Sequence, residues 1–221
     1  IIDCVNYATI KGTSEKSGNV GGIVGAAYYT DKNSWMIISG CKNHGSLSNK
    51  CMGVGGIVGL SAANVENCEN TGAINGNGTS IGGIVGEQQN AGHVIGCTNT
   101  AKITNTSTDF GTGGIIGWLR YNGADSDYKR KEVVEVSNNF NSGDVIGGTS
   151  AGGIVGHLYN AGKITGNENT ASEISSSNFQ AGIVGSIQNE DKNSFAGENN
   201  DIDVSNNVST TTTFSGTGGC K

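Results

Sequence analysis

The amino-acid sequence predicts an all-β protein that folds as a parallel β-solenoid, or β-helix, of about six to seven coils with a roughly three-sided cross-section. A glycine-rich pentapeptide recurs at intervals of about 27 to 40 residues, which is the spacing of stacked supersecondary units. A second motif, centred on asparagine, alternates with it. The pentapeptide reads GGIVG, or a close variant of it, at residues 21–25, 55–59, 82–86, 113–117, 152–156 and 181–185.

The composition agrees with a narrow stacked core. Of the 221 residues, 34% are hydrophobic and 6% aromatic, whereas glycine occurs 38 times and proline is absent. A solenoid needs few large side chains inside, and its strands need the backbone N–H that proline lacks. The repeats run through residues 1–221 without a linker, so we expect one domain. The chain opens inside a repeat and without methionine, so we also expect it to be part of a longer protein.

Charge and hydropathy argue against two classes of partner. The formal net charge is −6 at pH 7, and the basic residues are scattered apart from residues 129–131, which opposes binding to nucleic acid. No apolar run approaches the roughly 20 residues that span a bilayer. We therefore expect neither a nucleic-acid partner nor a transmembrane segment.

In each coil, the pentapeptide is predicted to form a strand. If its isoleucine points inward, strict alternation turns the next residue outward between glycines. A flat aliphatic stripe results, which is typical of a self-association or partner surface. The alternatives are that loops cover the stripe or that the two faces are reversed. The possible interface residues are Val24, Val58, Val85, Ile116, Val155 and Val184.

A bend and a second strand follow the pentapeptide. Glycine or asparagine, which both tolerate positive φ, precedes the second strand at Gly40, Asn67, Gly96, Asn138, Gly166 and Gly197. Alternate positions then hold a small residue, asparagine, a tiny residue and an aliphatic residue, so one face points inward. Stacked inward asparagines form a structural ladder of amide hydrogen bonds. The predicted ladder comprises Asn6, Asn43, Asn70, Asn99, Asn141, Asn169 and Asn200.

Four cysteines share one inward register, two residues before the ladder asparagines. They are Cys4, Cys41, Cys68 and Cys97. Parallel side chains in register have poor geometry for a disulfide, so we expect free thiols that pack as small hydrophobes. Cys51 and Cys220 lie outside this register, and spacing does not identify their partners. No Cys-X-X-Cys or Cys/His grouping occurs, so we expect no metal site and no cofactor.

The GGIVG core followed by the isoleucine, asparagine and glycine pattern resembles the GLUG-type repeat of bacterial surface proteins. The resemblance extends over nearly the whole chain. Such repeats occur in large secreted or wall-attached proteins, including adhesin-like molecules and the non-catalytic regions of some immunoglobulin-cleaving metallopeptidases. The resemblance implies an extracellular stalk or adhesive module on a bacterial cell surface. It marks architecture more than activity, so no binding residue is carried over.

The residue pattern indicates no enzyme. Only His44, His93 and His157 could act as imidazole bases, and none has a recognisable serine or cysteine nucleophile motif around it. Acidic residues near the second motif are separated by coils, which opposes the paired carboxylates of a glycoside hydrolase. The HExxH, Walker A and EF-hand motifs are missing as well.

Most tryptophans and tyrosines fall between a pentapeptide and the following asparagine strand, so we expect them to gather on one edge. Their faces can stack on sugar rings while polar neighbours bind the hydroxyls. The alternative is that the rings fold loops down over the solenoid. The possible glycan-binding residues are Trp35, Trp118, Tyr121 and Tyr159.

We interpret the chain as a non-catalytic extracellular structural and adhesive repeat module, either a surface stalk or a segment of a self-associating filament. Its expected partners are further copies, end to end or side by side, or a host or cell-surface protein or glycan. A glycan-binding or carbohydrate-active β-helix is the alternative. An ice-binding solenoid ranks third, because the threonines at 210–213 lie in one segment instead of recurring coil by coil.

Overall fold

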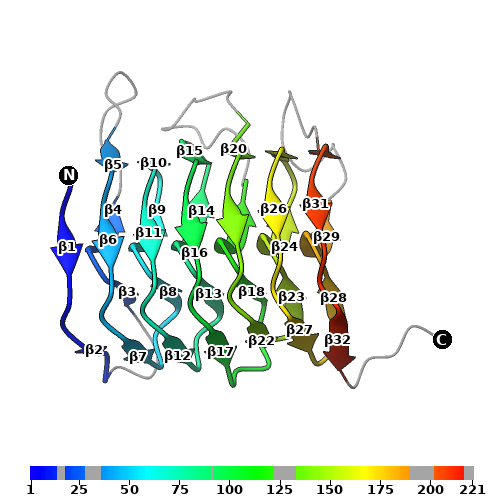
Figure 1. Cartoon of the computed structure of the whole chain (residues 1–221), viewed down its shortest axis with the longest axis horizontal. Coiled ribbons are helices and arrows are strands. Elements are labelled where there is room, and N and C mark those ends of the chain that lie inside the picture. Colours follow the sequence, from blue (N-terminus) through cyan, green and yellow to red (C-terminus); the bar gives the residue numbers. More distant parts are fainter. Residues whose placement is uncertain (14–17, 28–35, 91, 122–132, 190–201, 217–221) are drawn as a thin grey trace.

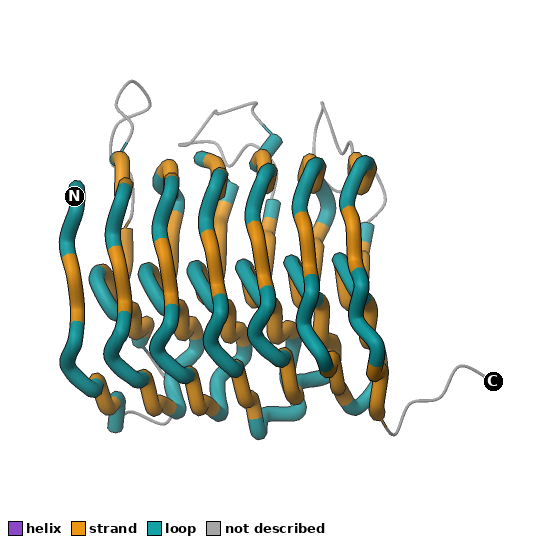
Figure 2. Tube along the Cα trace, viewed as in Figure 1, coloured by secondary structure: helices purple, strands orange, loops and turns teal. Residues whose placement is uncertain are grey.

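The computed structural model shows a parallel β-solenoid whose coils stack along the long axis of the molecule (Figure 1). The structure describes residues 1–13, 18–27, 36–90, 92–121, 133–189 and 202–216. These residues form short strands and loops, with no helix among them (Figure 2). The all-β solenoid that the sequence predicts is confirmed.

A complete coil, such as residues 37–61, contributes one strand to each of five parallel sheets, which we name A to E in the order in which that coil passes through them. Sheet A consists of β5 (Ile37–Ser39), β10 (Asn64–Glu66), β15 (His93–Ile95), β20 (Glu135–Ser137), β25 (Gly162–Thr165) and β30 (Ile202–Ser205). Sheet B consists of β1 (Val5–Asn6), β6 (Lys42–Asn43), β11 (Glu69–Asn70), β16 (Thr98–Asn99), β21 (Phe140–Asn141), β26 (Glu168–Asn169) and β31 (Val208–Ser209).

Sheet C follows with β2 (Ile10–Lys11), β7 (Leu47–Asn49), β12 (Ile74–Gly76), β17 (Ile103–Asn105), β22 (Val145–Gly147), β27 (Glu173–Ser176) and β32 (Thr213–Gly216). Sheet D consists of β3 (Asn19–Gly21), β8 (Gly53–Gly55), β13 (Ser80–Gly82), β18 (Gly111–Gly113), β23 (Ser150–Gly152) and β28 (Phe179–Ala181). Sheet E consists of β4 (Val24–Ala27), β9 (Val58–Ser61), β14 (Val85–Gln89), β19 (Ile116–Arg120), β24 (Val155–Tyr159) and β29 (Val184–Gln188).

We number the coils from the N-terminal end. Coil 1 comprises β1–β4, and coils 2 to 6 comprise β5–β9, β10–β14, β15–β19, β20–β24 and β25–β29. Coil 7 comprises β30–β32 in the part of the chain that the structure describes. Coils 1 and 7 therefore lie at opposite ends of the stack (Figure 1).

A residue with positive φ forms the corner between sheets A and B in every coil. This residue is Asp3, Gly40, Asn67, Gly96, Asn138, Gly166 or Asn206, with φ between 52° and 66°. Glycine has no Cβ to oppose this conformation, and asparagine tolerates it better than most residues. The bend predicted at Gly40, Asn67, Gly96, Asn138 and Gly166 is confirmed. The sixth predicted bend, Gly197, lies outside the described residues, and Asn206 forms the corner of coil 7.

The pentapeptide forms the corner between sheets D and E instead of a single strand. In coil 2, β8 ends at Gly55 and β9 begins at Val58. The N–H groups of Ile57 and Val58 both donate to the carbonyl of Ile84 in the next coil, each at 3.0 Å. With this extra corner, each complete coil has strands in five sheets, which is more than the roughly three-sided cross-section predicted from two motifs per coil.

The predicted outward aliphatic stripe is wrong. Because the corner interrupts strict alternation, the isoleucine and the valine of the pentapeptide both point inward. Ile57 and Val58 are both fully buried. Of the predicted interface residues, Val58, Val85, Ile116 and Val155 belong to the apolar core, and Val24 and Val184 are partly buried against it.

Sheets D and E pack backbone against backbone, which requires glycine. A Cβ atom on Gly55 would lie 2.0 Å from the carbonyl oxygen of Val58. One on Gly59 would lie 2.6 Å from the carbonyl oxygen of Gly25 in the preceding coil. In coils 1 to 5 the first and last glycines of the motif therefore allow a close backbone contact, whereas coil 6 has Ala181 in the first position.

Two apolar cores run along the stack. The larger combines aliphatic columns from sheets A and E, and includes Ile38, Val65 and Val94 with Val58, Val85 and Ile116. The smaller lies between sheets C and D and consists of two clusters. One is formed in coils 2 to 4 by Leu47, Val54, Ile74, Ile81 and Ile103, and the other in coils 5 and 6 by Val145, Ala151, Ala171 and Ile174. Both cores are narrow, which explains how a chain with few large side chains buries them fully.

Candidate functional site

The inward asparagines of sheet B form one continuous ladder along the stack. The Nδ2 group of Asn43 donates to Oδ1 of Asn70 at 2.7 Å, and that of Asn70 donates to Oδ1 of Asn99 at 2.8 Å. The Asn43 Nδ2 group also donates to the Gly45 carbonyl at 2.9 Å, so both of its protons are bonded. The ladder runs through Asn6, Asn43, Asn70, Asn99, Asn141 and Asn169.

The second glycine of each pentapeptide lies directly against this ladder. A Cβ atom on Gly56 would lie 2.5 Å from Cγ of Asn70, and one on Gly83 would lie 2.5 Å from Cγ of Asn99. The two sequence motifs are therefore the two sides of one contact across the interior. Asn70 and Asn99 are fully buried, so this ladder is a structural element and not a ligand surface.

The predicted seventh member of the ladder, Asn200, is wrong. Asn200 lies outside the described residues, and Ser209 occupies the position opposite Asn169 in sheet B. Asn169 Nδ2 donates to Ser209 Oγ at 3.1 Å and to Thr211 Oγ1 at 2.7 Å. Residue type explains the error, because Asn200 continues the column of asparagines in the sequence, whereas the residue opposite Asn169 is a serine.

A second column, two residues before the ladder, changes its chemistry halfway along the stack. Its members are Cys4, Cys41, Cys68 and Cys97 in coils 1 to 4, and Asn139, Asn167 and Asn207 in coils 5 to 7. Cys4, Cys41, Cys68 and Cys97 are free thiols. Cys4 is exposed at the end of the stack, and the other three are buried.

Thiols and amides in this column bond to equivalent backbone carbonyls. The Cys97 thiol donates to the Val65 carbonyl at 3.7 Å, and Asn139 Nδ2 donates to the Val94 carbonyl at 2.9 Å. Burial raises the pKa of the Cys97 thiol well above its usual range. A hydrogen bond from Cys97 lowers the pKa of the Cys68 thiol. The deeper thiol therefore stays protonated, as its role as a donor requires.

The four residues predicted for glycan binding do not form one site. Trp35 lies outside the described residues. Tyr121 is buried, with 3% of its surface exposed, so it is not available to a ligand. Trp118 and Tyr159 are partly buried in neighbouring strands of sheet E. The Arg120 guanidinium carbon lies 5.0 Å from the Trp118 ring centre, so this ring already has a cation over it.

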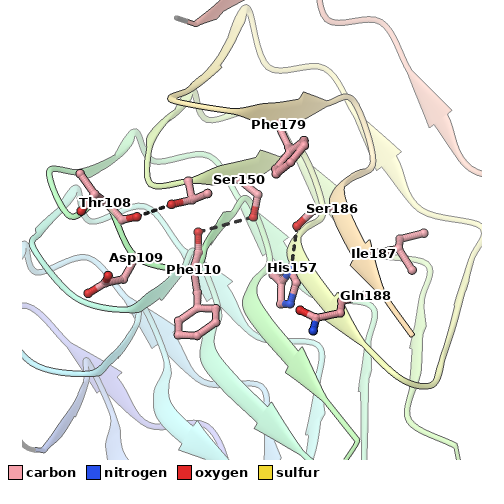
Figure 3. Close-up of a pocket in the computed structure, with 10 residues that line it drawn as sticks. Thr108, Asp109, Phe110, Ser150, His157, Phe179, Ser186, Ile187 and Gln188 are labelled. Atoms are coloured by element: carbon pink, nitrogen blue, oxygen red, sulfur yellow. Dashed lines mark hydrogen bonds between the residues drawn. The ribbon is translucent and has the colours of Figure 1, made fainter. Parts of the chain in front are cut away.

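A cavity of about 590 Å³ lies beside this part of sheet E, in coils 4 to 6 (Figure 3). One wall comes from the segments that lead into or begin the sheet D strands, and the other from β24 and β29. The lining residues are Thr108, Asp109, Phe110, Thr149, Ser150, His157, Phe179, Ser186, Ile187 and Gln188. Its size is that of a small-molecule pocket.

Backbone hydrogen bonds join the three segments of the first wall. The Ser150 N–H donates to the Phe110 carbonyl at 3.1 Å, and the Phe179 N–H donates to the Thr149 carbonyl at 3.0 Å. The Thr149 hydroxyl also donates to the Thr108 carbonyl (Figure 3). Coils 4, 5 and 6 are thus held together where they line the cavity.

His157 is the buried titratable group of the cavity, with 8% of its surface exposed. Its Nδ1 lies 2.7 Å from the Ser186 hydroxyl (Figure 3). Burial lowers the pKa of His157, so the ring is neutral at pH 7. Its Nε2 is buried and has no hydrogen-bond partner. A catalytic serine–histidine pair needs a third group that orients the ring, and the described residues place none at this nitrogen.

Two acidic residues near the second motif bond to side chains of neighbouring coils, Glu69 in an ion pair with a lysine and Glu66 with a histidine. Glu66 Oε1 lies 2.7 Å from His93 Nε2, and Glu69 Oε2 lies 3.1 Å from Lys42 Nζ. Among the described residues, no three His, Cys, Asp or Glu side chains are grouped so as to hold a metal ion. The same part of the chain has no helix long and apolar enough to cross a bilayer.

The sequence-based prediction missed the residues that line the cavity. Phe110, His157, Phe179 and Ser186 belong to no motif, and the coil geometry alone brings them together. One signal was present, however. The position just after the constant pentapeptide varies from coil to coil, as Ala26, Leu60, Glu87, Trp118, His157 and Ser186. A variable position on a constant scaffold is where a repeat protein places specific contacts.

Short parallel strands, stacked coil upon coil around buried columns, place this chain in the class of parallel β-solenoid repeat proteins. Within it, residues 51–75 and 77–104 match the model of the GLUG motif, so this part of the chain is a GLUG repeat region. Each match spans one full turn, from sheet D of one coil to sheet C of the next. The comparison with curated proteins gave no match, and neither did the comparison with solved structures.

Proposed function

We propose that this chain is a non-catalytic, extracellular structural and adhesive repeat module, in which the stack provides length and rigidity. The observation that carries the proposal is the unbroken bonding from coil to coil, with the amide ladder running from Asn6 to Asn169 and on to Ser209. Every coil is held by its neighbours, as in a solenoid that serves as a spacer. The extracellular, cell-surface setting rests on the resemblance to GLUG repeats of bacterial surface proteins.

The partner that we propose for the ends of the stack is a second copy of the chain. Strands β1 and β31 are the outer strands of sheet B, and each pairs on one side only among the described strands. Large apolar residues are exposed at both ends, with Ile2 and Val5 in coil 1, and Val208 and Phe214 in coil 7. Unpaired edges beside exposed apolar groups favour the stacking of further coils, which belong either to the same protein or to a second copy. Head-to-tail stacking of copies does not close on itself and yields filaments.

Negative-stain electron microscopy with analytical ultracentrifugation tests this proposal. We expect the unmutated chain, called the parent below, to form rods longer than the roughly 30 Å of seven stacked coils, and to associate as its concentration rises. Phe214→Lys should abolish association, because it places a charge on the exposed end of the sheet C column. Thr98→Lys, on the side of the stack in β16, is the matched control and should associate like the parent.

The outcomes separate the two modes of contact. Association that Thr98→Lys blocks and Phe214→Lys does not would replace end-to-end stacking with side-by-side contact. A parent protein that remains a monodisperse short rod at every concentration would contradict self-association and leave the stalk as the function to test.

A further inference from the structure

The cavity in coils 4 to 6 has an aromatic ring at each end. Phe110 belongs to coil 4 and Phe179 to coil 6, and 44% and 54% of their surfaces are exposed. Thr149 and Ser150 of coil 5 lie between them and are small. Their backbone segments are two coil spacings, about 10 Å, apart along the stack. Exposed apolar side chains around a hollow are typical of a contact site.

The Phe110 ring is supported from behind. It stacks on Trp118 with ring centroids 4.5 Å apart and an angle of 9° between the planes. Phe179, Ser186, His157 and Phe110 then follow one another across the cavity, with Gln188 next to His157 (Figure 3). A supported ring loses little freedom when a ligand packs on its open face, so the site is preorganised.

The polar groups of the cavity favour an uncharged ligand rich in hydroxyls. Asp109 is the one charged side chain among the lining residues at pH 7, since His157 is neutral. A carboxylate repels anions and accepts hydrogen bonds from hydroxyl groups. The exposed Gln188 amide offers both donors and an acceptor, and the Ser186 hydroxyl contributes as well.

Two buried nitrogen atoms beside the cavity lack hydrogen-bond partners. They are Nε1 of Trp118 and Nε2 of His157, and the two residues are register partners in β19 and β24. Buried polar atoms in proteins are nearly always hydrogen-bonded, so an orphaned one usually marks the position of a water or a ligand. The His157 side chain itself lines the cavity, and its Nδ1 lies 2.7 Å from the Ser186 hydroxyl of the same lining.

We infer that this cavity is a binding site for an uncharged mono- or disaccharide. A sugar ring combines an apolar C–H face, which fits Phe110 and Phe179, with a rim of hydroxyls, which fits Asp109 and Gln188. A purely apolar ligand would leave the carboxylate and the amide unpaired, and an anionic ligand would meet the carboxylate. The inference goes beyond the proposed function, because a chain that never self-associates could still bind sugar.

Isothermal titration and saturation-transfer NMR test the site with a defined panel of probes. The panel contains glucose, galactose, mannose, N-acetylglucosamine, maltose, lactose and cellobiose. We expect at least one probe to bind the parent protein. Phe110→Ala and Phe179→Ala should each weaken that binding by about tenfold, because each removes one stacking face. Both residues are exposed, and circular dichroism would verify that the variants fold.

Tyr7→Ala is the matched control. Tyr7 is also an exposed aromatic residue and stacks on His44 at 5.1 Å, but it lies in coil 1, away from the cavity. It should leave the affinity within about twofold of the parent. Failure of the whole panel to bind the parent would overturn the inference. So would equal binding by the parent and both phenylalanine variants, or equal losses in all three variants.

Charged sugars test the part of the inference that concerns Asp109. Galacturonate should bind more weakly than galactose, because the carboxylates repel each other. In Asp109→Asn this difference should shrink. If galacturonate binds the parent more tightly than galactose, the uncharged class of ligand is wrong.

Discussion

The two halves of the cysteine–asparagine column solve one structural problem in different ways. In coils 2 to 4 a thiol points to a carbonyl of the preceding coil, as Cys68 does to Ile38 at 3.6 Å. In coils 5 to 7 an amide does so at shorter distance, as Asn167 does to Val136 at 2.9 Å. The amides also bond to one another, with Asn139 Nδ2 donating to Asn167 Oδ1 at 2.9 Å.

The difference shows that this column requires a particular set of hydrogen bonds, which either cysteine or asparagine can make. Both side chains are small, donate to a buried carbonyl and accept from a backbone N–H. Cys97 Sγ accepts from the Cys68 N–H at 3.5 Å, and Asn139 Oδ1 accepts from the Cys97 N–H at 2.8 Å. A thiol is the weaker donor and acceptor, so the C-terminal half has the stronger bonds.

The largest expected effect lies in the amide ladder of sheet B, which runs through both halves. Asn70→Leu leaves Asn43 Nδ2 and Asn99 Oδ1 without their partners in the buried interior. We expect the free energy of unfolding to fall by about 2–6 kcal/mol. Thermal unfolding measures this loss. The control is Asn75→Leu, because Asn75 is exposed. An unchanged melting temperature for Asn70→Leu would contradict a stabilising role of the ladder.

The boundary between the halves gives the next effect. Asn139→Val removes the acceptor of the Cys97 N–H and the donor to the Val94 carbonyl, at a cost of about 2–4 kcal/mol. Asn139→Cys moves the boundary by one coil and should cost only about 1 kcal/mol, because a thiol already serves in the coil before. Chemical denaturation compares the two. Equal losses would mean that thiol and amide are not interchangeable here.

Thiol reactivity distinguishes the members of the N-terminal half. Brief treatment of the folded protein with iodoacetamide, followed by peptide mass spectrometry, should modify Cys4 and spare Cys97. Cys4 is exposed, whereas burial both shields Cys97 and raises its pKa well above the usual range. In denaturant the two should react alike. Rapid modification of Cys97 in the folded state would contradict its buried position.

The smallest effect is expected from pH, at His157 in the C-terminal half. Because burial lowers its pKa in the folded state, the unfolded chain binds the proton more readily. The contribution of His157 to stability is present above its ordinary pKa and is lost as the pH falls through that value toward the lowered one. Between pH 7 and pH 5 the parent should therefore lose more stability than His157→Gln. Parallel profiles would contradict this.

The bends and ladders were predictable because each coil repeats them at fixed offsets. Gly40 and Asn67 are residue types that tolerate positive φ, so the corner between sheets A and B could be predicted from them. The asparagine ladder was predictable because alternate residues of a strand point inward. The burial of Val58 was not predictable, since strict alternation fails where two N–H groups converge on the Ile84 carbonyl of another coil. Ser209 was missed because it is not an asparagine, whereas Asn200 matched the residue type of the ladder.

The cavity was unpredictable for a different reason. Phe110 and Phe179 are 69 residues apart, and only the stacking of coils 4 to 6 makes them neighbours of His157. Trp118 was singled out for its type, and it does support the site. Its role is to back Phe110, however, which composition alone could not indicate.

The amide bonds of the ladder all have the same direction. Asn6 donates to Asn43, Asn43 to Asn70, and so on to Asn169, and the second column repeats this sense from Asn139 to Asn167. The ladder is therefore polar along the stack axis. The acceptor oxygen of Asn6 lies at the coil 1 end, and the hydroxyls of Ser209 and Thr211 lie at the coil 7 end. If two copies met through their coil 1 ends, the acceptor oxygens of their Asn6 side chains would face each other without a donor between them. In any filament that continues the ladder, all copies must therefore have the same orientation along the filament axis.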